Sequence, residues 1–125
     1  MSVEENQVTE AVIGAAIEVH KHLGPGLLES AYQRAMEHEL RLRSVSFEAQ
    51  KSCALDYKGL TLDDAYRIDL LVEARVVVEI KAVEALADVH EAQVLTYLKF
   101  TGCHLGLLIN FRSKLIKDGL RRLAL

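Results

Sequence analysis

The sequence predicts a mixed α/β (α+β) fold in which helices pack against a sheet of antiparallel and parallel strands. Three observations support this prediction. Apolar residues recur at helical spacing in two segments of the first third of the chain. Strand-like alternation occupies the middle third. A further helical segment then precedes a short apolar strand, and a right-handed crossover of this kind places that strand parallel to its neighbour.

Two helices are predicted before the first strand. The first spans residue 4 to about residue 22, and its apolar stripe consists of Val8, Val12, Ala15, Ala16, Val19 and Leu23. Gly24-Pro25-Gly26 should end it, because proline between two glycines breaks a helical pattern. The second helix is expected from about residue 28 to residue 43, with an apolar stripe of Leu28, Ala31, Tyr32, Ala35, Met36 and Leu40.

Three strands should follow as an antiparallel meander. Residues 47–57 alternate like a strand, Lys58-Gly59 is typical of a turn, and residues 65–81 predict a hairpin. Two apolar sets within the hairpin should face the same side, so that pairing them gives an even register. These sets are Ile68, Leu70 and Val72 in one strand and Val76, Val78 and Ile80 in the other.

Three charged residues interrupt this apolar hairpin. The even register places Asp69, Glu79 and Lys81 together on the opposite face. Asp69 could lie across from Glu79 or Lys81, depending on whether the turn centres near Arg75 or slightly later. Two carboxylates converging beside a lysine would form a divalent-cation site, whereas the alternative is a cross-strand ladder of salt bridges.

The last third should supply a helix and a buried strand. The helix is expected over residues 88–101, capped by Asp88 and ended by Gly102. Residues 104–110 predict a buried strand. The remaining segment has two interpretations: Ser113 could cap a short helix, or residues 120–123 could form an edge strand.

Length, composition and charge bound the function. The 125 residues predict a single domain, 1–125. No apolar run approaches the ~20 residues needed to cross a bilayer, and the N-terminus lacks signal-peptide features, so we expect a cytoplasmic protein without a membrane partner. The net charge of −3 argues weakly against nucleic acid. The basic C-terminal stretch could still contact phosphates, although a solvated basic surface is the favoured interpretation.

The motifs together resemble a known family. Gly26-Leu27-Leu28-Glu29-Ser30-Ala31-Tyr32 matches the signature of the GxxExxY protein family, which is assigned to the PD-(D/E)xK nuclease superfamily. Asp69 followed by Glu79-Ile80-Lys81 resembles the superfamily's own motif, with Ile68 where its name has proline. The likeness extends to His90-Glu91-Ala92-Gln93, Tyr97 and Leu108-Ile109-Asn110-Phe111. It implies a restriction-endonuclease-like core of a helix, a three-stranded antiparallel meander, a helix and a strand, with an extra N-terminal helix.

The resemblance also implies catalytic and metal-binding roles. Asp69, Glu79 and the Ile80 backbone carbonyl would bind Mg²⁺ or Mn²⁺, because hard cations prefer oxygen ligands. Lys81 would orient the attacking water or neutralise the transition state. Glu29 would be an additional metal ligand, unless it only complements the dipole of its helix. Gln93 would brace Lys81 or hold a phosphate oxygen.

Three residues are expected in supporting roles. Tyr32 should pack in the core with its hydroxyl hydrogen-bonded to the site. Tyr97 shares a helix face with Gln93 and His90. A place on the surface away from the site is the alternative for His90.

The leading functional expectation is metal-dependent phosphodiester hydrolysis of nucleic acid, DNA more than RNA. The first alternative is a catalytically weak nuclease-fold domain that binds nucleic acid or a protein partner. The second is a structural oligomerisation module built on the N-terminal helix. A homodimer is expected because small nucleases of this type often pair to cut two strands.

Overall fold

The computed structural model describes residues 3–125. It confirms the mixed α/β fold class, with three α-helices and a five-stranded mixed sheet in the described range. In chain order the elements are α1 (Val3–Leu23), α2 (Glu29–Leu42), β1 (Phe47–Tyr57), β2 (Leu60–Val72), β3 (Val76–Lys81), α3 (Asp88–Thr101), β4 (Leu105–Asn110), the 3₁₀ helix η1 (Ile116–Asp118) and β5 (Leu120–Ala124).

The sheet has the order β1-β2-β3-β4-β5. Strands β1, β2 and β3 form the predicted antiparallel meander. Helix α3 returns the chain so that β4 pairs parallel to β3, as the crossover predicts. Strand β5 adds an antiparallel edge to β4. The arrangement agrees with a restriction-endonuclease-like core preceded by an extra helix.

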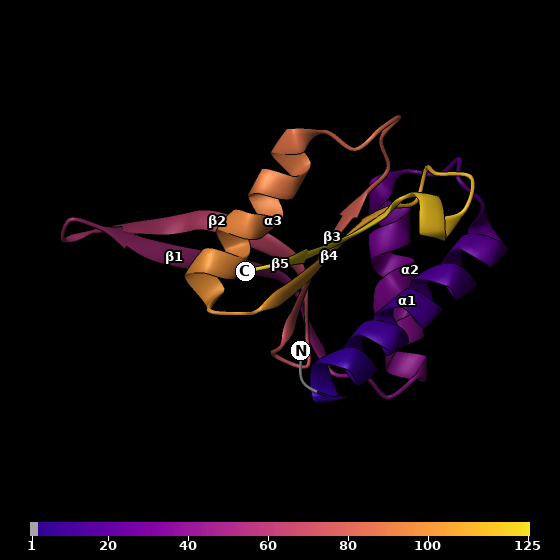
Figure 1. Cartoon of the computed structure of the whole chain (residues 1–125), viewed down its shortest axis with the longest axis horizontal. Helices are drawn as coiled ribbons and strands as arrows, with labels where there is room; N and C mark the ends of the chain where they lie inside the picture. Colours follow the sequence, from indigo (N-terminus) through magenta and orange to yellow (C-terminus); the bar gives the residue numbers. More distant parts are fainter. Residues whose placement is uncertain (1–2) are drawn as a thin grey trace.

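The sheet separates two layers of helices (Figure 1). Helices α1 and α2 cover one face, and their buried residues, including Val12, Met36 and Leu40, pack against Leu70 and Val78 of the sheet. Helix α3 covers the other face, where its side chains pack against the second set of sheet residues; this smaller cluster contains Ile68, Leu71, Val77, Val94, Tyr97, Leu98 and Leu108. No helix described between residues 3 and 125 is both long and apolar enough to cross a membrane.

The turn between β2 and β3 gives the even register that the sequence predicts. Val72 pairs with Val76 and Leu70 with Val78, so the turn centres on Ala74, next to Arg75. Both Glu73 and Ala74 have φ near +50°, which non-glycine residues seldom adopt. Continuing this register places Asp69 across from Glu79 and excludes the alternative with Lys81.

The prediction that Ile68 shares a face of the sheet with Leu70 and Val72 is wrong. Ile68 packs in the α3-side cluster, whereas Leu70 packs in the cluster beneath α1 and α2. The neighbouring β1 strand has a backbone irregularity at Gln50, whose φ is +50°. Strict alternation therefore breaks at Asp69, between the two apolar residues. The break leaves Asp69 near the end of the regular β2–β3 pairing, which includes Leu70 but not Asp69.

Three element boundaries also differ from prediction. Strand β2 begins at Leu60, ahead of residue 65, so the β1–β2 hairpin is long and extends away from the rest of the fold (Figure 1). The residue that caps α3 is Ala87 and not Asp88. Both interpretations of the C-terminal segment hold in part, because η1 and β5 both form, but Leu115 precedes η1 in the position expected for Ser113.

Candidate active site

Two carboxylates meet where β2 and β3 separate. Asp69 accepts a hydrogen bond through Oδ2 from the Ile80 backbone N–H at 2.9 Å. Glu79 accepts one through Oε1 from the Asp69 backbone N–H at 3.3 Å. Each carboxylate therefore hydrogen-bonds a backbone N–H of the opposing strand in place of the missing ladder bonds. This reciprocal pairing holds both acidic side chains at one point of the sheet.

Glu79 is almost completely buried, with 2% of its surface exposed. Burial is the main reason that the pKa of Glu79 rises to about 9, and the Asp69 carboxylate raises it further through a hydrogen bond and its charge. The Asp69 backbone N–H and the charge of Lys81 act in the opposite direction on this pKa. Without a bound cation, Glu79 is therefore neutral at pH 7.

Helix α3 adds an aromatic hydroxyl to this pair. The pKa of Tyr97 is raised by burial first and then by the negative charges of Glu79 and Asp69. A hydrogen bond with the Gln93 side chain and the charge of Arg67 lower it. Tyr97 therefore lies within electrostatic reach of both carboxylates. The Gln93 side chain forms a hydrogen bond with Tyr97 on the same helix.

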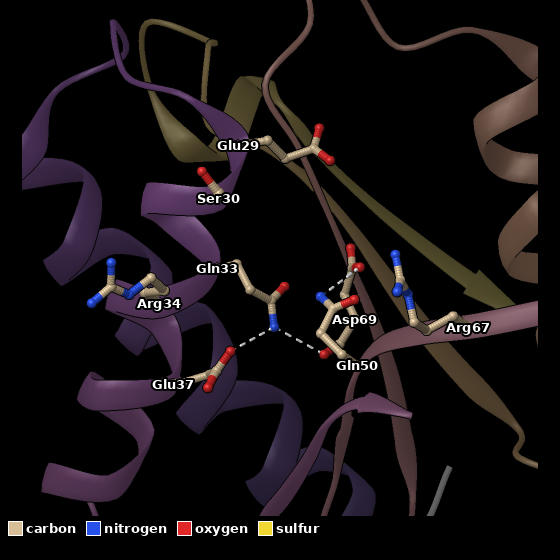
Figure 2. Close-up of a pocket in the computed structure, with 8 residues that line it drawn as sticks. All are labelled: Glu29, Ser30, Gln33, Arg34, Glu37, Gln50, Arg67 and Asp69. Atoms are coloured by element: carbon tan, nitrogen blue, oxygen red, sulfur yellow. Dashed lines mark hydrogen bonds between the residues drawn. The ribbon is translucent and has the colours of Figure 1, made fainter. Parts of the chain in front are cut away.

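An open cleft of about 440 Å³ lies beside Asp69, between α2 and the strands β1 and β2. Figure 2 shows Gln33 reaching from α2 toward Asp69, with Arg67 on the other side of the Asp69 side chain. Gln33 donates to the Asp69 backbone carbonyl at 3.0 Å, and Gln50 donates to Asp69 Oδ1 at 3.3 Å. These contacts fix Asp69 from both sides and leave it at the wall of the cleft.

The segment after β3 is tied to two other elements. Glu29, in the first turn of α2, accepts a hydrogen bond from the Ala82 backbone N–H at 3.2 Å. Asn110, buried at the end of β4, bonds both backbone groups of Val83: it accepts from the N–H at 3.0 Å and donates to the carbonyl at 2.9 Å. These contacts hold the chain immediately after Lys81.

Replacing Asn110 with alanine tests this connection. Asn110→Ala leaves the partly buried Val83 backbone groups without these bonds, which should lower the free energy of unfolding by about 1 kcal/mol. Amide hydrogen exchange at Val83 should accelerate more than the change in global stability explains. Ser113→Ala is the control, because Ser113 donates no side-chain bond to this segment. Unchanged exchange at Val83 in Asn110→Ala would contradict the role of Asn110.

Two of the expected supporting residues point elsewhere. The Tyr32 hydroxyl donates to the Gly24 carbonyl and accepts from the Leu27 backbone N–H, so it holds the α1–α2 connection and not the site. Its ring stacks on Phe111. His90 accepts a hydrogen bond through Nδ1 from the Ala87 N–H, which stabilises the start of α3.

Several polar residues at the site are missing from the sequence-based prediction. They are Gln33, Gln50, Arg67 and Asn110. For Arg67 a signal exists, because a residue two positions before Asp69 in a strand tends to share its side of the sheet. Asn110 also carries a signal as the polar end of an apolar strand. Gln33 and Gln50 can be recognised as site residues only when the positions of α2 and β1 beside β2 are known.

The donor set fits a divalent cation in part. Residues 3–125 contain no cluster of three or more His, Cys, Asp or Glu side chains arranged to hold a metal ion. Glu29 is thus not grouped with Asp69 and Glu79, and its carboxylate bonds Ala82. Mg²⁺ needs only one or two carboxylates from the protein, because it retains several waters. The crowding of two carboxyl groups, one of them buried, is also the kind of strain that a cation relieves.

The fold is consistent with a restriction-endonuclease-like core, and two carboxylates meet at its sheet. The sequence model of the PD-(D/E)XK nuclease superfamily matches residues 6–123, and the chain belongs to that superfamily. No curated protein and no solved structure matched the chain in the corresponding comparisons. Superfamily members usually use divalent metals and act on nucleic acid.

Proposed function

We propose that this chain, acting as one domain, is a nuclease that hydrolyses phosphodiester bonds of nucleic acid, DNA more than RNA, with Mg²⁺ or Mn²⁺. The observation that supports it most is the meeting of Asp69 and Glu79 where β2 and β3 separate. Lys81 follows two residues later, and its charge reaches Glu79. The open cleft beside Asp69 gives a substrate access.

In this proposal Asp69, Glu79 and the Ile80 carbonyl would hold the cation. When bound, the cation would polarise the phosphate and lower the pKa of a coordinated water. Glu79 is neutral at pH 7 in the free protein and would have to release its proton to serve as a ligand. The Lys81 ammonium group orients the water or offsets the negative charge that develops on phosphorus oxygens.

Helix α3 provides the remaining polar groups. Gln93 holds the Tyr97 hydroxyl, and this hydroxyl lies within electrostatic reach of both carboxylates. A neutral hydroxyl and amide at this position can donate hydrogen bonds to phosphate oxygens without adding charge. Their place in the site supports a role for Gln93 in substrate contact and for Tyr97 in support.

The test is hydrolysis of labelled single-stranded, double-stranded and branched DNA and RNA with Mg²⁺ or Mn²⁺. Asp69→Asn should lower the rate on the order of a thousandfold, because several kcal/mol of metal-dependent transition-state stabilisation is lost. Lys81→Met should also abolish cleavage. The matched control is Asp63→Asn, which changes an exposed aspartate of the same strand.

Three outcomes are informative. Cleavage by wild type and Asp63→Asn but not by Asp69→Asn supports the nuclease and identifies its substrate. Equal cleavage by Asp69→Asn and wild type contradicts the proposed site. If wild type binds metal and nucleic acid but cuts none of the substrates, the domain acts as a binding module.

Light scattering tests the proposed homodimer, and a monomer mass would contradict it.

A further inference from the structure

Arg67 lies at the candidate site without an assigned role. It is two residues before Asp69 on β2, and both residues line the 440 Å³ cleft. Its positive charge lowers the pKa of Tyr97, whereas Asp69 and Glu79 raise it, so all three charges act on the same hydroxyl. Figure 2 shows the Arg67 side chain extending beside the Asp69 carboxylate.

The guanidinium group of Arg67 is exposed and, within residues 3–125, forms no ion pair. Four other arginines of this acidic protein are paired with glutamates, and these are Arg41, Arg43, Arg75 and Arg121. Within residues 3–125, Arg34, which lines the same cleft, also forms no ion pair. Arg67 thus keeps its donors available at the wall of a cleft that also contains Asp69. An available planar donor set beside a candidate hydrolytic centre suits an anionic substrate group.

We propose that Arg67 binds a phosphate of the nucleic-acid backbone in the cleft, next to the phosphate that is cut. This inference rests on the proposed nuclease function and deepens it. The planar guanidinium group can donate two parallel hydrogen bonds to the non-bridging oxygens of one phosphate. Arg67 and Lys81 then supply positive charge close to the two carboxylates, which would otherwise repel the backbone.

The composition of the cleft indicates what kind of contact the substrate makes. Its lining residues are charged or polar, and none of them is aromatic: Glu29, Ser30, Gln33, Arg34, Glu37, Gln50, Arg67 and Asp69. Proteins that hold unpaired bases usually stack them on aromatic side chains. Contacts in this cleft are therefore to phosphate and sugar, which carry no sequence information directly. Arg67 should accordingly contribute equally to the binding of different base sequences.

The experiment measures affinity for a short fluorescein-labelled DNA, single-stranded and duplex, between about 50 and 200 mM salt. The Asp69→Asn background prevents cleavage during the measurement. Arg67→Gln and Arg67→Lys are compared with Arg75→Gln. Arg75 is an exposed arginine in the turn at the opposite end of the β2–β3 hairpin, so its loss removes the same charge away from the cleft.

Arg67→Gln should weaken binding about tenfold for two unrelated base sequences. It should also reduce the slope of log affinity against log salt by about 0.9 for duplex and 0.7 for single-stranded DNA. Arg67→Lys should retain the slope and lose part of the affinity, because it keeps the charge but not the planar pair of donors. Arg75→Gln should change neither quantity.

Equal effects of Arg67→Gln and Arg75→Gln would overturn the inference. Cleavage by the wild type, measured in parallel, separates the two hypotheses: if wild type cuts DNA but the slope is unchanged in Arg67→Gln, only the role of Arg67 fails. If wild type neither cuts nor binds DNA or RNA, the proposed function and this inference both fail.

Discussion

Glu79→Gln should abolish metal-dependent cleavage while making the protein more resistant to unfolding at alkaline pH. Cleavage is lost because an amide is a poorer ligand for Mg²⁺ than a carboxylate and cannot compensate its charge. The loss should be on the order of a thousandfold if several kcal/mol of transition-state stabilisation disappear. Glutamine has nearly the shape of the protonated side chain, so it can keep the contact with the Asp69 backbone N–H.

The gain in stability follows from the raised pKa of Glu79. Between its ordinary value of 4.5 and about 9, the folded protein holds a proton that the unfolded chain has lost. The contribution of Glu79 to stability is therefore fully present below pH 4.5 and is lost as the pH rises toward 9. The slope is at most about 1.4 kcal/mol per pH unit. Glutamine cannot ionise, so this decline is absent from the variant.

Chemical unfolding of wild type and Glu79→Gln at pH 5 and pH 8, without divalent metal, measures this effect. The variant should gain stability relative to wild type between these pH values, by on the order of a few kcal/mol. Glu48→Gln is the control, because Glu48 is an exposed glutamate on β1. Adding Mg²⁺ at pH 8 should stabilise wild type and not Glu79→Gln. Identical pH dependence of the two proteins would contradict the buried, protonated state of Glu79.

Gly106→Ala should cause the second large effect, on stability and activity together. A Cβ atom at Gly106 of β4 would lie 2.6 Å from Cγ1 of Val94 on α3, and both side-chain positions are in the buried layer between helix and sheet. A β-branched residue in a helix has little rotamer freedom to yield. Helix α3 must therefore move, at a cost of about 1–3 kcal/mol. The same helix carries Gln93 and Tyr97, so cleavage should also fall.

Melting temperature and cleavage rate measure the effect, with Gly26→Ala as the control. A Cβ at Gly26 meets no heavy atom within 4 Å. A second variant, Gly106→Ala with Val94→Ala, removes the clashing methyl group, so its destabilisation should be smaller than the sum of the two single changes. A Gly106→Ala protein as stable and active as Gly26→Ala would show that the contact between α3 and β4 is not tight.

Periodicity predicted much of the fold because the apolar face of each helix or strand must be buried against the core. Val12 and Ala15 of α1 and Met36 of α2 lie on the apolar faces that helical spacing predicts, and all three are buried in the core. The buried strand after Gly102 and its parallel pairing follow from a helical crossover. The even register of the hairpin was predicted, but the centre of its turn was left open, because the turn uses positive φ at Glu73 and Ala74 and contains no glycine. Ordinary turn chemistry does not identify such a turn.

The sequence predicted only the part of the candidate site that two neighbouring strands of one hairpin bring together. Asp69 and Glu79 share a hairpin, so their meeting could be expected from alternation, and the structure places them together. The roles assigned to them remain predictions. The Tyr32 hydroxyl was expected at the site but bonds within the α1–α2 connection. His90, for which a place away from the site was the alternative, bonds the start of α3. Gln33 and Asn110 contribute through tertiary contacts between distant segments, which no local pattern reveals.

Calorimetric titration of the purified protein with Mn²⁺ tests the central claim, that Asp69 and Glu79 form a divalent-cation site. It requires no knowledge of the nucleic-acid substrate. We expect wild type and Asp63→Asn to bind one ion per chain, and Asp69→Asn and Glu79→Gln to bind it at least roughly tenfold more weakly. Equal binding by all four proteins, or no binding by wild type at millimolar Mn²⁺, would contradict it.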